Sequence, residues 1–406
     1  MTEILLALLL TTILLVALTL LLHSMREILL PSRPVTVTVN RERKVRGATN
    51  YKLLDILNAG GVPVPSGCAG AGTCGLCRVG SVAGAGDALP TEKARLTPAE
   101  LREGTRLACQ VVVRGDLAVE VSAEILGIIA MRATVASTCS VTPLIKEIVF
   151  QLPPDAAFAF RAGNFVQVTA PVYRLPFTQI DIDPAFTAEW DRLKLRALVA
   201  EAREPVSRAY SVASRPADRG TVVLNIRLAV PPPAAKSAAP GVVSSFLFGL
   251  KVGDTAAIAG PYGHFHAQDT DREMVFIGGG VGMAPLRAII FDQLERVGTT
   301  HPITFFYGAR SASELFYMAE FEELAVRHPN FRFVPALSEP ARGSDWRGET
   351  GFVHDIAFRS YLRDHPAPEA CEYYLCGPPL MIEAVYAMLD ECGVEPASIF
   401  NDDFGI

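Results

Sequence analysis

Four cysteines in the first third of the chain are the feature that most constrains its fold. Three of them stand close together, with five residues and then two residues between them: Cys68, Cys74 and Cys77. The fourth, Cys109, follows further along the chain. Thiolates bind iron, and four of them hold a [2Fe–2S] cluster. Glycines within this stretch let the backbone curl and aim N–H groups at the sulfurs: Gly70, Gly72 and Gly75.

The cysteine spacing is similar to that of a ferredoxin-type domain. Plant-type ferredoxins have four residues between the first two cysteines, whereas this chain has five. A zinc site is the alternative, although zinc sites usually come as two close Cys-x-x-Cys pairs. Eight cysteines in 406 residues are too sparse for a disulfide scaffold. No ligand spacing links Cys139, Cys371 and Cys392, so we expect these three to be structural.

The start of the chain predicts a membrane anchor. Residues 4–22 carry no charge, and as a helix they would span about 28 Å, close to the roughly 30 Å hydrocarbon core of a bilayer. A cleaved signal peptide is the alternative, but no Lys or Arg precedes the run and no Ala-x-Ala-like site follows it. Positive residues, which mark the cytoplasmic side, follow the run at Arg26, Arg33, Arg41, Arg43, Lys44 and Arg46. We therefore expect a single-pass protein with its soluble domains in the cytoplasm.

Periodicity divides the remainder of the chain. Alternating apolar residues predict strands at 35–39, 110–113, 117–121, 133–138, 145–152, 165–169 and 222–227. A helix is expected at 51–58, and residues 188–202 form a polar, helix-compatible insertion. Later, strands at 274–277, 303–307, 331–336 and 373–376 alternate with helices at 314–327 and 356–363, which favours a parallel sheet with helices on both faces. The net charge of −6 argues against nucleic acid as a partner.

An expected strand near the middle of the chain carries the tetrapeptide Arg208-Ala209-Tyr210-Ser211. It resembles the flavin motif of the ferredoxin–NADP reductase superfamily, which is Arg, any residue, Tyr, Ser. The resemblance implies that Arg208 binds the pyrophosphate, that the Tyr210 ring lies against the isoalloxazine and that Ser211 hydrogen-bonds near flavin N5. On an ordinary strand these residues would simply alternate between core and surface.

A second segment matches the same superfamily, with a glycine followed three residues later by serine: Gly241, Val242, Val243 and Ser244. This segment usually accompanies FAD rather than FMN. A helix that begins there would receive phosphate at its N-terminus.

A glycine-rich turn resembles the nucleotide loop of that superfamily and contains Gly278, Gly279, Gly280 and Gly282. Pro285 stands where the third glycine of Gly-x-Gly-x-x-Gly would fall, and a turn that merely packs a helix on a sheet is the alternative. The superfamily places a Cys-Gly-Pro segment beside the nicotinamide, which here is Cys376, Gly377 and Pro378. The choice between NADH and NADPH stays open, because Arg310 and Ser311 suit a 2′-phosphate whereas Glu314 suits a ribose hydroxyl.

The end of the chain carries a further resemblance. Relatives in the superfamily often end with an aromatic residue on the flavin face that the nicotinamide must reach, and Phe404 is the aromatic residue near this carboxyl end. Phe404 is thereby implied as a catalytic residue together with Ser211 and Cys376. A frayed surface tail is the alternative.

Together, the anchor and the motifs resemble, over the whole chain, the F subunits of the bacterial sodium-translocating NADH:quinone oxidoreductases. The resemblance implies NADH as donor, FAD as first acceptor and the [2Fe–2S] cluster as relay, at the cell inner membrane. It also implies partner membrane subunits that reduce ubiquinone while sodium is exported. The reductase component of an oxygenase, which shares the three soluble domains, and a membrane-tethered redox sensor are the alternatives.

The expected fold class is multidomain, α+β and α/β. We expect a transmembrane helix at 1–25 and a β-grasp ferredoxin-type domain at 33–126. An antiparallel β-barrel that binds FAD is expected at 127–267, followed by a parallel-sheet NADH-binding domain at 268–406.

Overall fold

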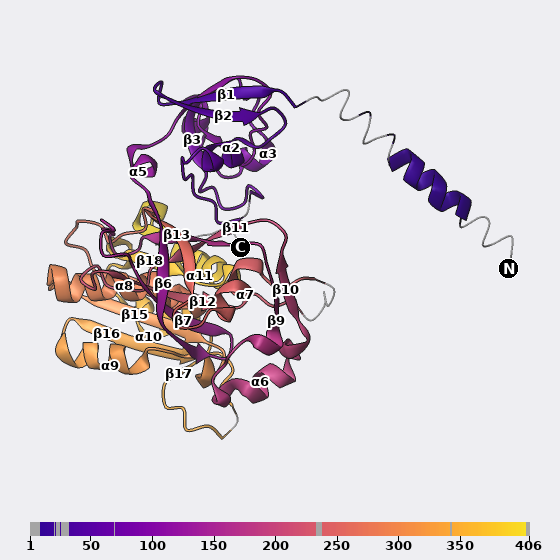
Figure 1. The fold of residues 1–406 in the computed structure, drawn as a ribbon. Helices are drawn as coiled ribbons and strands as arrows, with labels where there is room; N and C mark the ends of the chain where they lie inside the picture. Colours follow the sequence, from indigo (N-terminus) through magenta and orange to yellow (C-terminus); the bar gives the residue numbers. More distant parts are fainter. Residues whose placement is uncertain are drawn as a thin grey trace. The chain divides into compact units, whose positions relative to one another are not determined.

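The computed structural model describes residues 9–19, 21, 25, 32–68, 70–232, 238–341 and 343–402 (Figure 1). They divide into two compact units. The first holds the described residues up to Val64 together with Gly70–Leu126, and the second holds the described residues of Pro65–Ala69 and Gly127–Ile406. The predicted catalytic residue Phe404 lies outside the described residues.

Residues 9–19 are helical, and their side chains are all exposed. Among the described residues, no helix is both long and apolar enough to cross a membrane. The anchor predicted over 4–22 extends beyond the residues described there, so the predicted span itself is not seen.

The first unit is built on a five-stranded mixed sheet in the order β2-β1-β5-β3-β4. Strands β1 (Pro34–Val39) and β2 (Arg43–Ala48) form an antiparallel hairpin, and β1 pairs in parallel with β5 (Leu117–Glu120). Strand β3 (Arg78–Ala83) runs antiparallel to β5 and to β4 (Arg106–Leu107). Alternate residues of β1 enter the core, where they join four buried residues of helix α2 (Leu53–Ala59): Leu53, Leu54, Ile56 and Leu57.

The first unit also corrects one expected strand. Residues 110–113 form no strand; Val112 makes a single bridge to Lys52. This segment lies next to the cysteine site, and its backbone bonds instead to the start of α2, where Leu53 N donates to Val111 O. Short helices complete the unit: α3 (Pro90–Lys93), α4 (Pro98–Arg102) and α5 (Ala123–Leu126).

The second unit begins with a six-stranded antiparallel sheet in the order β11-β8-β13-β6-β7-β12. Its strands are β6 (Ile129–Thr142), β7 (Ile145–Gln151), β8 (Phe165–Ala170), β11 (Val206–Ser211), β12 (Thr221–Arg227) and β13 (Thr255–Tyr262). Val212, next to β11, bridges to Leu224 of β12 and so brings the two sheet edges together. The result is a half-barrel around a core that includes Ile148, Val166, Val168, Leu224 and Ile226.

The insertion after β8 differs from the helix expected at 188–202. Helix α6 (Thr187–Arg192) ends before Lys194, which adopts a left-handed conformation. Strand β10 (Val199–Ala202) then pairs with β9 (Tyr173–Pro176) and buries Ala200 and Ala202. Trp190 ties the insertion to the barrel, since its indole N–H donates to Pro143 O at 2.7 Å.

The rest of the second unit is a parallel sheet in the order β17-β16-β15-β14-β18-β19. The strands are β14 (Met274–Gly279), β15 (Ile303–Ala309), β16 (Phe331–Leu337), β17 (Glu349–Thr350), β18 (Glu372–Cys376) and β19 (Ile399–Asn401). Helices α8 (Met283–Phe291) and α9 (Met318–Arg327) share one core with Phe276 of β14. Helices α10 (Val353–Ser360) and α11 (Pro379–Glu391) share the other with Val275 and Ile277. Helices on both faces confirm the predicted parallel α/β arrangement (Figure 1).

Candidate cofactor sites

Three of the four predicted cluster ligands lie in the first unit, where Cys74, Cys77 and Cys109 are buried. Hydrogen bonding to Cys109, burial and the charge of Cys74 raise the pKa of the Cys77 thiol. The three sulfurs thus form one local group. Cys68 is half-buried and belongs to the short segment grouped with the second unit.

Glycines shape the loop that carries the cysteines. Gly70, Gly72 and Gly75 have φ values of 81°, 83° and 69°, a left-handed region that other residues enter only with strain. A Cβ atom at Gly72 would lie 2.8 Å from the Gln110 side chain. The loop therefore fits a cluster, because its glycines allow backbone to wrap closely around a compact buried group.

Gln110 connects a cluster ligand to this loop. Its Nε2 donates to Cys109 Sγ at 3.2 Å and to Gly70 O at 3.1 Å. The hydroxyl of Thr91 donates to Gln110 Oε1 at 3.2 Å and so orients the amide. Lys52 Nζ also donates to Gly70 O, at 3.0 Å.

A buried ion pair supports the strand before Cys109. Arg106 Nη2 lies 2.7 Å from Glu92 Oε2, and the two side chains are 8% and 0% exposed. Glu92 also accepts the backbone N–H of Leu107 at 3.0 Å and of Leu89 at 2.9 Å. Burial alone would raise the pKa of Glu92, but hydrogen bonds from Arg106 and the two amides outweigh it and lower the pKa.

Strand β11 presents the predicted flavin motif in the second unit. Arg208 donates to Ser207 O at 2.9 Å, and within the described part of the chain no carboxylate pairs with its guanidinium. Burial raises the pKa of Tyr210, and its hydroxyl has no hydrogen-bond partner among the described residues. A cation without a carboxylate partner beside a half-buried tyrosine ring fits an anionic aromatic ligand such as a flavin nucleotide.

Helix α7 (Val242–Gly249) begins at the second predicted flavin segment, with Gly241 as its N-cap. Ser244 Oγ accepts the Ala229 amide and donates to Gly241 O, both at 3.2 Å. A Cβ atom at Gly241 would lie 2.7 Å from Ser244 Oγ. Because Ser244 is committed to the backbone, the groups available to a phosphate here are N–H groups of the first turn, which include those of Val242 and Val243.

The nucleotide loop and the Cys-Gly-Pro segment meet at the carboxyl ends of two adjacent inner strands of the parallel sheet, β14 and β18. Gly278 of β14 and Cys376 of β18 are register partners. A Cβ atom at Gly282 would lie 1.9 Å from Cys376 O, and one at Gly377 would lie 3.1 Å from Gly279 N. The two predicted nucleotide motifs, which also include Gly280 and Pro378, therefore line the carboxyl ends of adjacent strands, where such sheets bind ligands.

Asp402 joins the flavin motif to the nucleotide motif. Ser211 Oγ donates to Asp402 Oδ2 at 2.8 Å, and Cys376 Sγ contacts Asp402 O at 3.8 Å. The structure thus brings together two predicted catalytic residues through a third that was not predicted. Because β19 has only three residues, the local sequence pattern gave no signal for this role of Asp402.

Two of the residues that left the choice between NADH and NADPH open, Arg310 and Glu314, form an ion pair. The guanidinium of Arg310 binds the carboxylate of Glu314, which also accepts the Arg310 backbone N–H at 3.3 Å. Ser311 and Ser313 hydroxyls lie 3.0 Å apart. Glu314 therefore lies where it would repel a 2′-phosphate that approached Arg310.

A second group of potential metal ligands occurs in the described part of the chain: Glu273, His365 and Cys371. His365 Nδ1 accepts the Ala367 amide hydrogen, and Nε2 lies 3.2 Å from Glu273 Oε2. With Nδ1 as an acceptor, Nε2 is the ring nitrogen that donates to the Glu273 carboxylate. Since neither ring nitrogen offers a lone pair, we assign no metal to this group.

Comparisons with known proteins identify the domains that contain these sites. Three family models match: a 2Fe-2S iron-sulfur cluster binding domain at 37–114, an oxidoreductase FAD-binding domain at 193–267 and an oxidoreductase NAD-binding domain at 276–387. The F subunit of the Na(+)-translocating NADH-quinone reductase of Klebsiella pneumoniae is 44% identical over 99% of this chain and 100% of its own. The chain belongs to this family of F subunits. The Neisseria gonorrhoeae member is 43% identical over 99% of this chain and 100% of its own.

Solved structures share the fold. The cytochrome P450 reductase GcoB of Amycolatopsis is 27% identical, with a TM-score of 0.62 over 91% of this chain and 98% of that one. The ferredoxin reductase in carbazole 1,9a-dioxygenase has a TM-score of 0.58 at 24% identity, over 92% and 99%. Oxygenase-type reductases thus share the architecture, but membership of the F-subunit family excludes the oxygenase-reductase and redox-sensor alternatives. The predicted FAD, NAD and [2Fe–2S] domains and the place in a multi-subunit NADH-quinone reductase are confirmed.

Proposed function

We propose that this chain takes a hydride from NADH at the carboxyl ends of the strands of its parallel sheet and delivers single electrons to membrane partner subunits. Those subunits then reduce ubiquinone while sodium is exported. The observation that supports this most is the meeting of Ser211, Cys376 and Asp402. Ser211 belongs to the flavin motif, Cys376 belongs to the nucleotide motif and Asp402 directly follows β19, so we propose that donor and acceptor meet beside them.

The barrel residues would hold FAD. Arg208 and the amides at the start of α7 neutralise the pyrophosphate, and Tyr210 provides the flat surface for the ring. Bound FAD supplies two-electron acceptance with one-electron release, which no side chain can supply. The Ser211 hydroxyl donates to Asp402, so its oxygen would accept a hydrogen bond from the ring. Phe404 is proposed to cover the ring until the nicotinamide displaces it.

The nucleotide residues would position NADH. Gly280, where a Cβ atom would meet nothing within 4 Å, leaves room for the pyrophosphate before α8, while Gly278 and Gly279 allow Leu286 and Met381 to pack closely. The segment from Cys376 to Pro378 would lie beside the nicotinamide. Glu314 disfavours a 2′-phosphate and is available to a ribose hydroxyl. We therefore propose NADH rather than NADPH as the donor.

The cysteine residues would hold the [2Fe–2S] cluster, with Cys68, Cys74, Cys77 and Cys109 as its ligands. Four thiolates supply the charge that such a cluster needs, and the buried loop keeps water away from three of them.

We further propose that the N-terminal region anchors the chain in the bacterial inner membrane, with the soluble domains in the cytoplasm. The exposed apolar side chains of the 9–19 helix support this, because such a surface needs a nonpolar environment. The proposed parts are the anchor at 1–25, the cluster domain at 33–126, the flavin domain at 127–267 and the nucleotide domain at 268–406.

The decisive experiment purifies the full chain from membranes with its partners and measures NADH-dependent quinone reduction with and without sodium. We expect sodium to stimulate turnover. A chain that starts at Pro34 should still pass electrons from NADH to artificial acceptors, but it should lose quinone reduction in membranes because tethering supplies local concentration. A wild-type chain whose flavin NADH cannot reduce would contradict the proposal.

A further inference from the structure

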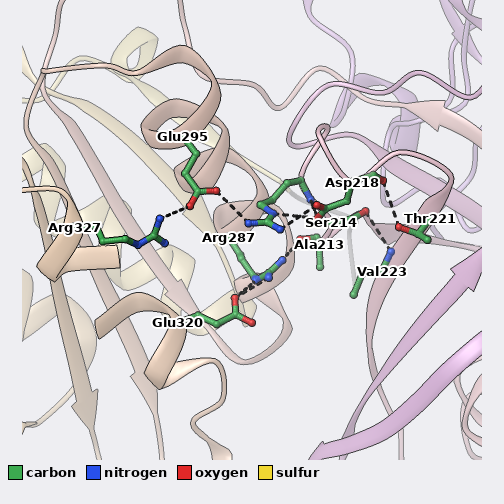
Figure 2. A network of polar contacts seen from close by, with 10 residues as sticks. Ala213, Ser214, Asp218, Thr221, Val223, Arg287, Glu295, Glu320 and Arg327 are labelled. Carbon is green, nitrogen blue, oxygen red and sulfur yellow. Dashed lines mark hydrogen bonds and ion pairs between the residues drawn. The ribbon is translucent and has the colours of Figure 1, made fainter. Parts of the chain in front are cut away.

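Two half-buried side chains of the parallel-sheet part attach it to the barrel. Arg287 on helix α8 and Tyr317, the N-cap of α9, both bond to barrel residues. Figure 2 shows Arg287 between Glu320 and Ala213, with the charged pairs of Asp218, Glu295 and Arg327 nearby.

The Arg287 guanidinium contacts both parts. Nη1 donates to Ala213 O at 2.7 Å and Nε donates to Glu320 Oε2 at 2.8 Å, while Nη2 lies 2.7 Å from the same carboxylate oxygen. The group lies over the Phe291 ring at 5.1 Å and the Tyr317 ring at 4.8 Å, and the side chain is 12% exposed. A planar guanidinium that is hydrogen-bonded along its edges and lies over aromatic rings is held in one orientation.

The position of the barrel contact matters. The flavin motif ends at Ser211, and Ala213 lies two residues after it. Arg287 lies on the helix that starts at the nucleotide loop, whose Gly282 directly precedes α8. The contact between Arg287 and Ala213 therefore links the element that carries the flavin motif to the element that carries the nucleotide loop.

Tyr317 provides a second attachment to the barrel. Its hydroxyl accepts a hydrogen bond from Asn225 Nδ2 of β12 at 2.8 Å and donates to Glu147 of β7. Tyr317 has a φ of 60°, a conformation that costs free energy in a bulky residue and persists only where its surroundings enforce it.

We propose that Arg287 and Tyr317 are positioning residues that together fix the angle between the nucleotide sheet and the flavin barrel. Either attachment alone leaves more freedom of rotation than the two together, because they hold the sheet to the barrel at different points. Hydride transfer requires reacting atoms about 3–3.5 Å apart, and a 1 Å displacement costs about a hundredfold in rate. This inference rests on the proposed transfer of hydride from NADH.

An exposed ion pair that also connects the barrel to the parallel-sheet part provides a matched control. Arg215 of the barrel pairs with Glu295 of the nucleotide part at 3.1 Å, but its side chain is 37% exposed. Exposed pairs contribute little. Arg215→Gln should therefore change flavin reduction by no more than about twofold, although it also removes a contact between the two parts.

The test is stopped-flow reduction of the flavin in the full chain by NADH and by NADH deuterated at C4, with rates expressed per bound flavin. Arg287→Lys keeps the charge but loses the fork, and we expect its limiting rate to fall about tenfold to a hundredfold. The affinity for NADH should change little and the deuterium effect should persist, because alignment and not binding is lost. A loss that is merely structural would lower the melting temperature or flavin content without changing the rate per bound flavin.

Tyr317→Phe tests the second attachment, and it tests the proposed positioning role by itself if Arg287→Lys does not fold. It keeps the ring under Arg287 and removes only the hydroxyl, and we expect a smaller decrease in the same limiting rate. Wild-type rates per bound flavin in the folded variants would overturn the inference. That result would leave the proposed function intact, since only a wild-type flavin that NADH fails to reduce contradicts the function.

Discussion

The cysteine site and the hydride site are assembled in opposite ways. Three predicted cluster ligands, Cys68, Cys74 and Cys77, occur within ten consecutive residues, so chain geometry alone keeps them together. The hydride site instead joins Ser211 to Asp402 across 191 positions. A site of the first kind depends on its loop, whereas a site of the second kind depends on how whole elements pack. Variants in the two sites should therefore fail differently.

The largest contrast comes from removing a cluster ligand. Cys109→Ala should abolish the electron-spin signal of the reduced [2Fe–2S] cluster, because no other thiol in that buried position can replace the ligand. Reduction of the flavin by NADH should survive. Exposed Cys139 supplies the control, and Cys139→Ala should keep the full signal. A normal signal in Cys109→Ala would refute the ligand assignment.

The next effect concerns the scaffold of the cysteine site. Glu92→Gln leaves Arg106 buried without a counter-charge, which costs about 3–5 kcal/mol. We expect earlier loss of cluster absorbance on heating of the full chain, with flavin release much less affected. Loss of both chromophores at the same lower temperature would show that the two sites do not fail independently.

The same pair gives a pH dependence. The pKa of Glu92 is lower in the folded chain than its ordinary value of 4.5. Its contribution to stability is therefore complete above that value and is lost as the pH falls towards the lowered pKa. Glu92→Gln should consequently flatten the decline in stability of the cluster domain as the pH falls below that ordinary value. An unchanged acid-unfolding curve, measured by cluster absorbance, would contradict this expectation.

This contrast also explains what the sequence could predict. Local spacing indicated the cysteine loop and the glycine turns, and the strand patterns indicated most of the barrel and the parallel sheet. Barrel strand β13 and the short sheet strands β17 and β19 were not expected. Strand β10 was mistaken for helix because its pairing with β9 lies outside the segment. Strand β19 has three residues, too few for a periodic signal, and helix α11, which buries only Val385, Met388 and Leu389, was not expected. The contact between Arg287 and Ala213 spans 74 positions and leaves no mark in either local pattern.

A smaller effect is expected at the assembled site. Asp402→Asn removes the charge that Ser211 bonds to, and hydrogen bonds to charged groups contribute about 1.5–3 kcal/mol. Flavin reduction by NADH should slow about tenfold to a hundredfold, with the cluster signal unchanged. Ser211→Ala should give a similar loss, and the double variant should add little, because both remove one interaction. Additive losses would show that the two residues act separately.

The smallest expected effect tests whether the cysteine site depends on Gln110, a residue that is not one of its ligands. Gln110→Leu removes the amide that donates to Cys109 Sγ while it retains a side chain of similar size. A donor to a ligand sulfur stabilises the reduced, more negative cluster, so its loss should make the reduction potential more negative. A neutral hydrogen bond contributes about 0.5–1.5 kcal/mol, which corresponds to about 20–60 mV for one electron. Thr91→Val, which only releases the Gln110 amide, should shift the potential in the same direction by less. A redox titration followed by electron-spin resonance measures both shifts, and an unchanged potential in Gln110→Leu would leave the cysteine site dependent on its own loop alone.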